Sequence, residues 1–290
     1  LRADHLSFAY GRTDVLHGVS FRVPTGGLTG ILGPNGSGKT TLLKLLAGLL
    51  SPSKGSVWIG EDEADVSQRS RRALALQMAL VPQETQLAFD YSVLEITLMG
   101  RYPHLGPLKL ESPGDLHVAR AALAATGTAG LEQRPFSTLS GGEKQRVIIA
   151  SALAQLAPSR DAKNVVAPVP SVLLLDEPTA SLDLSYQLEV AATLRALNTD
   201  RATAMVVSTH DLNFAASVCR DLVILRGGRV LEAGPTEEVL TAKNIRAAYD
   251  VEVSVTVVVG VGRPHVHPFA PRDRGRDPTS VGHHQAFLER

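Results

Sequence analysis

The 290-residue chain has little of what secreted, membrane-spanning or nucleic-acid-binding proteins need. Its single cysteine, Cys219, excludes an internal disulfide and suits a reducing compartment, and we assign that thiol no role. No run reaches the roughly 18 apolar residues of a spanning helix, and the first residues lack the pattern of a secretory leader. The 29 basic and 29 acidic residues cancel, so no net charge draws the chain to nucleic acid or an anionic bilayer. We therefore expect a soluble globular protein that is neither secreted nor embedded in a membrane by itself.

Apolar runs and helical periods alternate along the chain as in an α/β protein. Hydrophobic residues make up 44%, enough for one large or two modest domains. Short apolar runs predict strands at residues 6–10, 15–23, 28–32, 56–59, 78–81, 172–175, 203–208, 222–225 and 229–231. Helical spacing predicts helices at residues 41–49, 93–101, 115–126, 147–156, 183–197, 211–218, 236–240 and 242–249, and Ser67 is a candidate cap. The helices between about residues 84 and 157 form an insert in the α/β frame.

Two polar stretches interrupt this pattern. Residues 158–171 read as a long exposed loop to which we assign no function. Residues 251–259 are strand-like, whereas residues 260–290 are rich in proline, arginine and histidine, and we expect much of that tail to be loosely ordered. The tail carries His265, His267, His283 and His284. These histidines are metal-ligand candidates, but their spacing and the flanking prolines provide no fixed scaffold.

The stretch Gly33 to Thr40 reads GPNGSGKT, a complete G-x-x-x-x-G-K-[ST] pattern between a predicted strand and a predicted helix. Its glycines allow the backbone N–H groups to approach phosphate oxygens, and the helix directs its positive end at them. In this arrangement Lys39 neutralises the β and γ phosphates and Thr40 binds Mg²⁺ through its hydroxyl. The pattern therefore predicts a nucleotide-phosphate site.

Two carboxylates follow the apolar strand at residues 172–175. Asp176 is placed to hold Mg²⁺, and Glu177 is placed to accept a proton from, or align, the water that attacks the γ-phosphate. Gln83, at a strand end, is either an ordinary loop residue or a contact to the metal or the water. His210 follows another strand and faces the γ-phosphate unless it is structural. Tyr10 is an adenine-stacking platform or a core residue, and spacing alone leaves both open.

A second candidate anion site begins at Ser140. The run Ser140-Gly141-Gly142-Glu143 opens a predicted helix and so offers N–H groups and the positive end of a dipole to an anion. Because the phosphate loop already holds one nucleotide, a second anion site for the same γ-phosphate implies another copy of the chain. We therefore expect ATP to lie between two copies.

Taken together, these motifs resemble the ATP-binding subunit of an ABC transporter. The resemblance rests on Tyr10, GPNGSGKTT from Gly33, Gln83, LSGGEKQR from Leu139, LLLDEP from Leu173, SLD from Ser181, and His210, and it covers residues 1 to about 250. It implies a P-loop NTPase (RecA-like) core with an antiparallel β subdomain and an inserted ABC-type α-helical subdomain at about residues 84–157. Residues 251–290 are then a separate C-terminal strand and tail.

The resemblance also implies a role for each matching residue. Tyr10 stacks on adenine, Gln83 links the site to the membrane partner and takes part in metal binding and catalysis, Glu177 is the catalytic base, Asp183 belongs to the D-loop, and His210 is the switch histidine. Thr40, Gln83 and Asp176 contact Mg²⁺, and Ser140, Gly141, Gly142 and Glu143 contact the γ-phosphate from the second copy. The phosphate loop comprises Gly33, Pro34, Asn35, Gly36, Ser37, Gly38, Lys39, Thr40 and Thr41.

Two segments narrow the resemblance to a subgroup. Residues 93–106 and 176–187 are similar to those of importers of ferric siderophores, haem and cobalamin. The subgroup implies a homodimer on the cytoplasmic face of the cell membrane, bound to two permease subunits and indirectly to a solute-binding protein. The alternatives are an importer of a different solute and an ABC ATPase without a permease. Members of the latter class usually resemble two fused copies or carry coiled-coil insertions, which this chain lacks.

Overall fold

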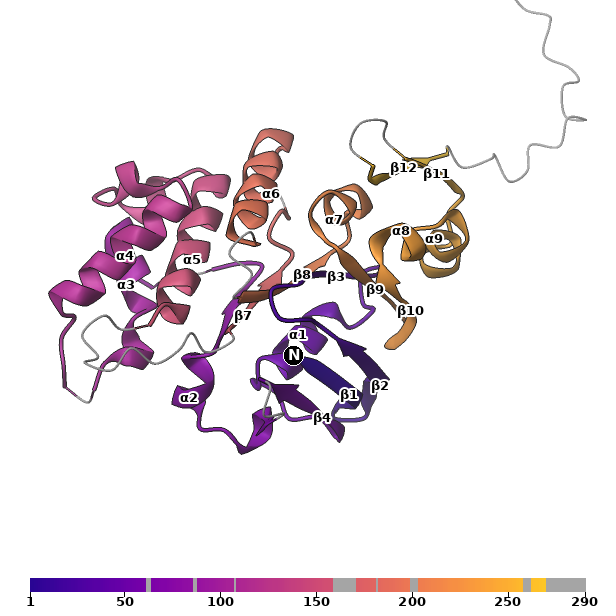
Figure 1. The fold of residues 1–290 in the computed structure, drawn as a ribbon, viewed down its shortest axis with the longest axis horizontal. Helices are drawn as coiled ribbons and strands as arrows, with labels where there is room; N and C mark the ends of the chain where they lie inside the picture. Colours follow the sequence, from indigo (N-terminus) through magenta and orange to yellow (C-terminus); the bar gives the residue numbers. More distant parts are fainter. Residues whose placement is uncertain are drawn as a thin grey trace, which may run out of the picture.

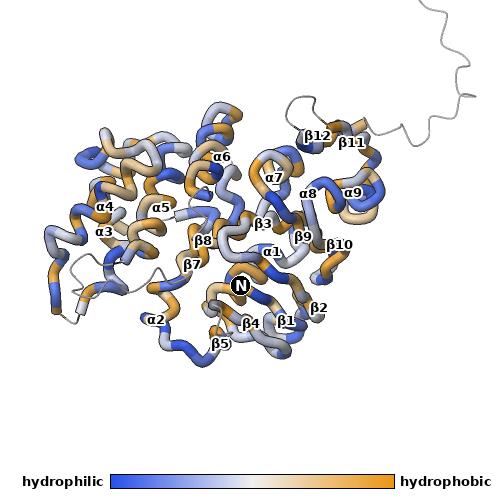
Figure 2. Tube along the Cα trace, in the orientation of Figure 1, coloured by the Kyte–Doolittle hydropathy of each residue, from blue (hydrophilic) through white to orange (hydrophobic). Residues whose placement is uncertain are grey.

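A central six-stranded sheet organises the structure, a computed structural model that describes residues 1–60, 64–85, 88–106, 108–158, 171–180, 182–198, 203–257 and 262–269. Its strand order is β10-β9-β3-β8-β7-β6, and neighbours run parallel except β10 and β9. The strands are β3 (Leu28–Leu32), β6 (Met78–Val81), β7 (Ser171–Asp176), β8 (Thr203–Thr209), β9 (Asp221–Arg226) and β10 (Arg229–Pro235). Apolar residues run along β7 and β8 (Figure 2), as expected for parallel strands covered on both faces. The predicted α/β core is confirmed.

A smaller antiparallel sheet covers one face of this core. Its order is β2-β1-β4-β5, with β1 (Arg2–Tyr10), β2 (Thr13–Arg22), β4 (Lys54–Ile59) and β5 (Ala64–Asp65). Helix α1 (Lys39–Leu46) lies between the two sheets (Figure 1) and buries four leucines, Leu42, Leu43, Leu45 and Leu46. The His17 N–H donates to the Gly228 carbonyl at 2.9 Å and ties this sheet to the β9–β10 turn. Packing on both sides therefore holds the first turn of α1 at the end of β3.

The predicted helical insert forms its own layer (Figure 1), with α3 (Val93–Met99), α4 (Pro113–Ala125) and α5 (Gly141–Leu156). Each helix begins at a capping box, formed by Ser92 with Glu95, Ser112 with Asp115, and Ser140 with Glu143. Short 3₁₀ turns connect them: η2 (Tyr102–His104), η3 (Ala129–Leu131) and η4 (Phe136–Thr138). The three helices share an apolar core separate from the two beside the central sheet. This lobe can therefore pack as a unit.

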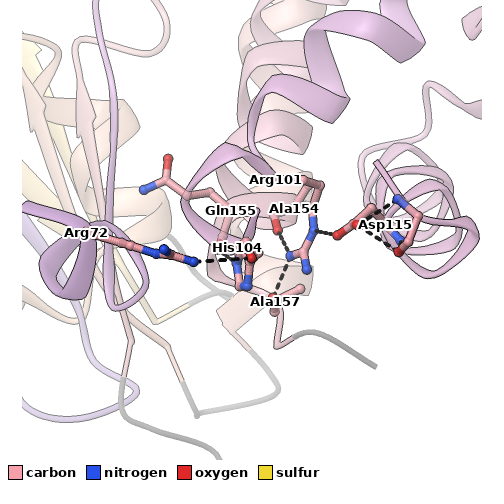
Figure 3. Close-up of polar contacts among 8 residues, drawn as sticks. Arg72, Arg101, His104, Asp115, Ala154, Gln155 and Ala157 are labelled. Atoms are coloured by element: carbon pink, nitrogen blue, oxygen red, sulfur yellow. Dashed lines mark hydrogen bonds and ion pairs between the residues drawn. The ribbon is translucent and has the colours of Figure 1, made fainter. Parts of the chain in front are cut away.

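Polar contacts join the helical lobe to the sheet (Figure 3). Gln155 of α5 donates from Nε2 to the carbonyls of Ala75 at 2.8 Å and Met78 at 2.9 Å. Arg72, in α2 (Arg71–Ala75), donates from Nε to the Pro103 carbonyl at 2.9 Å and from Nη2 to the His104 carbonyl at 3.4 Å. His104 Nε2 lies 2.7 Å from the Gln155 carbonyl oxygen (Figure 3) and must donate to it, because a carbonyl only accepts. Burial lowers the pKa of His104 and so favours the neutral imidazole with its proton on Nε2. Side chains from both units thus determine the position of the lobe.

The prediction that Ser67 caps a helix is wrong. Ser67 lies inside the 3₁₀ turn η1 (Val66–Gln68), whose cap is Asp65, and α2 is capped by Ser70. The Asp65 carboxylate accepts from the Ser67 N–H at 2.8 Å. The turn is therefore capped by Asp65, two residues before Ser67.

Helices α6 (Leu184–Asn198) and α7 (Leu212–Val218) cover the sheet face opposite α1. Successive residues of β7 alternate between the two faces, with Leu173 and Leu175 toward α6 and Val172 and Leu174 toward α1. Helices α8 (Thr236–Val239) and α9 (Ala242–Tyr249) follow β10. Cys219 is fully buried, and burial raises the pKa of its thiol, which supports an inert packing role.

The C-terminal region contains a strand that the sequence did not predict. Strands β11 (Val253–Val257) and β12 (Pro264–Pro268) pair antiparallel, with Val255 opposite Val266; the first was expected, and the second lies in the tail of which much was expected to be loosely ordered. Val266 is 4% exposed and packs in the main core, but one buried valine between two histidines is too short a signal to show a strand period. Most of the loop predicted at residues 158–171 lies outside the described residues, because only residues 158 and 171 are described. Residues 270–290, with His283 and His284, also lie outside the described residues. The division at residue 250 stays a prediction.

Two further features complete the fold. No helix among the described residues is both long and apolar enough to cross a membrane. His265 and His267 lie with ring centroids 4.6 Å apart, but no group of three or more His, Cys, Asp or Glu side chains in the described segments is arranged to hold a metal.

Candidate functional site

The predicted phosphate loop lies between β3 and α1 and turns through several glycines. At Gly33 a Cβ atom would lie 2.5 Å from both the Leu225 carbonyl oxygen and Ser37 Oγ. At Gly38 the backbone has φ 100°, and a Cβ would lie 2.7 Å from Leu16. Larger residues at these two positions would clash with the surrounding walls or strain the backbone, so the close turn requires glycine.

The positive N-terminal end of α1 is not neutralised by a capping side chain or by an acidic residue in the first turn. Its cap, Gly38, has no side chain, and its first turn, Lys39-Thr40-Thr41, contains no acidic residue. Ser37 Oγ is buried and has no hydrogen-bond partner among the described residues. By contrast α3, α4 and α5 each begin with a capping box, which bonds the N–H group of the cap residue and that of the third helical residue. Free N–H groups, a buried hydroxyl and a positive helix end fit a bound phosphate.

Lys39 turns back onto its own loop. Its Nζ atom donates to the Gly33 carbonyl at 2.9 Å and to the Pro34 carbonyl at 3.3 Å, and it lies 3.4 Å from Glu177 Oε1. The side chain is 6% exposed. A buried ammonium held by two carbonyls and a carboxylate is ready to exchange these partners for phosphate oxygens.

Asp176 and Glu177 are fixed by the adjacent strand. Asp176 lies opposite Ser208 in the β7–β8 register, and Ser208 Oγ donates to Asp176 Oδ1 at 2.6 Å. Glu177 has φ 45°, a conformation that costs a non-glycine residue about 1–3 kcal/mol. Its N–H donates to the Ser208 carbonyl at 3.0 Å and to Ser208 Oγ at 3.1 Å, which holds this strained backbone in place.

The Glu177 carboxylate lies between two nitrogen atoms. Oε1 faces Lys39 Nζ, and Oε2 lies 2.7 Å from His210 Nδ1. The His210 side chain is 56% exposed, whereas that of Glu177 is only 12% exposed. The structure therefore brings Lys39, Glu177 and His210, which are far apart in the sequence, to one edge of the sheet.

Other predicted site residues lie outside this cluster. Gln83 is exposed, and no hydrogen bond or ion pair within the described residues links it to Glu177. Tyr10, at the end of β1, is 49% exposed with its ring edge-on to Phe8, so it is not a core residue. Thr40 and Asn35 are exposed on the loop and Asp183 is exposed after β7. These side chains are open to a ligand or partner.

The stretch Ser140 to Glu143 begins α5 in the helical lobe, apart from α1 (Figure 1). The Ser140 N–H donates to Glu143 Oε2 at 2.8 Å, which lowers the pKa of that carboxyl, and Ser140 Oγ accepts from the Glu143 N–H at 3.3 Å. A Cβ atom at Gly142 would lie 2.3 Å from the Tyr186 ring, so α6 packs directly against this turn. Arg146 further pairs with Glu189 of α6.

Two supporting residues were missed by the sequence analysis. Ser208 bonds the Asp176 carboxylate and the Glu177 backbone N–H, and Tyr186 packs on Gly142. For Ser208 the available signal was its position two residues before His210 at the end of an apolar strand. For Tyr186 the sequence contained no comparable signal, because the contact joins two elements of different layers.

Replacing Lys39 with alanine is expected to weaken ATP binding by roughly 10- to 100-fold, because a hydrogen bond to a charged group contributes about 1.5–3 kcal/mol. Titration of a fluorescent ATP analogue measures the effect. Lys44→Ala, at an exposed position of the same helix, is the matched control and should bind normally. Unchanged affinity in the Lys39 variant would contradict the phosphate-loop assignment.

Comparison with known proteins agrees with this geometry. Residues 16–159 match the family model for "ABC transporter". A cobalamin import ATP-binding protein of Halobacterium salinarum is 39% identical over 93% of this chain, which spans only 63% of that relative. A hemin import ATP-binding protein of Bradyrhizobium diazoefficiens is 39% identical over 94% of this chain and 96% of its own length. A solved structure, described as a metal-chelate type ABC transporter in an inward-facing conformation, superposes with a TM-score of 0.77 at 28% identity, covering 93% of this chain and 97% of that one. The chain thus belongs to the family of ABC transporter ATP-binding proteins.

Proposed function

We propose that this chain binds and hydrolyses ATP as the energy-supplying subunit of an ABC importer for an iron chelate, haem or cobalamin. The observation that carries the hydrolytic role is the Glu177 carboxylate, held 2.7 Å from His210 and 3.4 Å from Lys39 beside an uncapped phosphate loop. A charged carboxylate at this place is the base that phosphoryl transfer to water needs.

In this mechanism ATP draws Lys39 away from Glu177. The ammonium and the N–H groups of α1 then stabilise the phosphate charge, which releases the Glu177 carboxylate from its ion pair with Lys39. Glu177 takes a proton from the attacking water, and His210, bonded to its other oxygen, fixes the direction of the carboxylate. Tyr10 supports the adenine ring by stacking.

Mg²⁺ fits the oxygen atoms near this site. Thr40 has an exposed hydroxyl, and Asp176 is a carboxylate oriented by Ser208, so both are ligands of the type that Mg²⁺ prefers. We assign these two residues and Gln83 to the metal, which neutralises phosphate charge when bound.

A second copy completes the site. Ser140 to Glu143 lie in the helical lobe rather than beside the phosphate loop of the same chain, and the exposed Asp183 follows β7. A head-to-tail pair places the first turn of α5 of one copy over the γ-phosphate held by the other, with Asp183 at the seam. The pair closes when ATP binds and opens after hydrolysis, and this movement supplies the energy for import.

The partner in the membrane binds beside Gln83. A groove next to it is lined by Thr85, Ala88, Phe89, Asp90, Phe136, Ser137 and Lys144. Phe89 is 71% exposed, which is unusual for a large apolar ring and suits burial against a permease helix. Docking there places the protein at the cytoplasmic face of the membrane. It also connects the permease to Gln83 and to the helical lobe.

The solute class rests on the relatives named above, which import cobalamin and hemin. The test is to purify the chain with its permease, reconstitute the complex in liposomes, and compare ATP hydrolysis with binding proteins loaded with cobalamin, haem or a ferric siderophore. One of the three should raise hydrolysis several-fold. Stimulation only by another solute would refute the solute class, and failure to associate with any permease would favour an ABC ATPase without one.

A further inference from the structure

The C-terminal hairpin is fastened to α7 at both ends of that helix. Asn213 in the first turn accepts from the Val266 N–H at 2.8 Å and donates from Nδ2 to the Val266 carbonyl at 3.1 Å. Arg263 Nη1 donates to the carbonyls of Ala216 at 2.9 Å and Cys219 at 2.8 Å, at the other end. Figure 1 shows β11 and β12 beside α7. Four hydrogen bonds therefore join the hairpin to α7 and its C-cap residue, Cys219.

Helix α7 begins directly after His210. Its cap, Asp211, accepts from the N–H groups of Asn213 and Phe214 at 2.9 Å each, and its own N–H donates to Thr209 Oγ1 at 3.0 Å. Asn213 thus bonds to the cap through its backbone and to β12 through its side chain. A shift of α7 would move the backbone on the C-terminal side of His210.

The His210 side chain depends on this backbone for its direction. It is 56% exposed, and within the described residues its side-chain hydrogen bond is the one to Glu177. More than half of the surface of this side chain is open to solvent. The position of α7 therefore decides whether the 2.7 Å contact forms.

The same C-terminal segment approaches the site a second time. Tyr249 ends α9, which precedes β11, and its hydroxyl is buried. Burial raises the pKa of the Tyr249 hydroxyl, and a hydrogen bond with the Gly33 backbone lowers it. The segment thus reaches both the phosphate loop and the helix behind His210.

We propose that the β11–β12 hairpin positions His210 for hydrolysis, with Asn213 and Arg263 as the positioning residues. The proposal rests on the proposed role of His210 at Glu177. The hairpin holds α7, α7 holds the backbone of His210, and His210 directs the Glu177 carboxylate. ATP binding does not involve this chain of contacts, because the phosphates bind at the opposite side of Glu177, at Lys39.

The test uses Asn213→Ala in the full-length protein. This change keeps the backbone N–H that bonds Asp211 and removes only the two hydrogen bonds to Val266. We expect kcat to fall roughly three- to tenfold with ATP affinity unchanged, because small misplacements of catalytic groups slow the chemical step. Arg263→Ala should act alike, and Arg263→Lys, which keeps a cation at the carbonyls, should restore most of the rate.

Ser217→Ala is the matched control, since it removes a hydrogen bond of 2.8 Å to Phe214 within the same helix but none to the hairpin. It should leave kcat unchanged. In a His210→Ala background, Asn213→Ala should lower the residual rate no further. An equal loss in both backgrounds would show a merely structural role and overturn the proposal.

The outcomes also separate the two levels of inference. If His210→Ala slows hydrolysis but Asn213→Ala and Arg263→Ala do not, the hairpin proposal is refuted and the site assignment stands. If His210→Ala keeps the parent rate, the role of His210 fails, and the hairpin proposal falls with it.

Discussion

Glu177→Gln is expected to lower ATP turnover by at least about 100-fold, the usual contribution of a general base. Glutamine has the same shape and still bonds to His210, but its amide cannot accept the proton of the attacking water. The change also removes a negative charge beside the phosphates, so ATP binding should be intact or tighter. The variant should therefore hold ATP between two copies without hydrolysing it.

Two measurements test this expectation. Phosphate release gives the turnover, and size-exclusion chromatography with and without ATP and Mg²⁺ gives the state of association. Glu237→Gln, an exposed change in the first turn of α8, is the control and should hydrolyse ATP normally. Hydrolysis at the parent rate in the Glu177 variant would show that another group is the base.

The site could be predicted from short contiguous motifs, because each motif contains both the reactive side chains and the strand or turn that positions them. Gly33 to Thr41 contains its own strand-to-helix turn, and Asp176-Glu177 ends a buried strand, so their neighbours in the sequence indicate where they lie. The structure confirms that Lys39, Glu177 and His210 meet, although their separate roles stay predictions. The parallel order of β3, β8 and β7 explains the meeting, because such strands end at one edge.

The missed features depend on register and packing between elements. Ser208 supports Asp176 only because β7 and β8 pair with these two residues opposite each other, and one residue of slip would remove the contact. Tyr186 reaches Gly142 across two helices. Strand β12 is stabilised by the hydrogen bond from the Val266 N–H to Asn213 and by packing of the Val266 side chain in the main core. The proline- and histidine-rich composition of this segment does not predict these contacts. None of these arrangements has a local sequence pattern.

The ion pair between Arg101 and Asp115 was missed for the same reason and matters more for stability. Arg101 is fully buried at the end of α3, and its Nε donates to Asp115 Oδ1 at 2.8 Å. Its Nη1 donates to the carbonyls of Ala154 at 2.6 Å and Ala157 at 2.7 Å, at the end of α5 (Figure 3). One guanidinium thus joins all three helices of the lobe and satisfies carbonyls that α5 leaves open.

Arg101→Met is expected to destabilise the protein by about 3–5 kcal/mol, the loss typical when one partner of a buried pair is removed. The aliphatic side chain fills most of the space but leaves the Asp115 carboxylate and two carbonyls without their donor. Burial raises the pKa of Asp115, but the hydrogen bonds from Arg101 and Ser112 outweigh it and lower the pKa overall. Asp115 therefore stabilises the fold above the ordinary aspartate pKa, and this contribution is lost as the pH falls through its lowered value.

Urea unfolding at neutral pH and in acid measures both effects. Arg120→Met is the matched control, because Arg120 pairs with Glu132 at 3.0 Å in the same lobe but is half exposed. An exposed pair contributes about 0–1 kcal/mol, so this control should unfold almost like the parent. If Arg101→Met cost no more than Arg120→Met, the buried guanidinium would not be what joins the helices. With the expected loss, the helical lobe should also exchange its amide hydrogens faster than the central sheet, because the three helices would separate before the sheet unfolds.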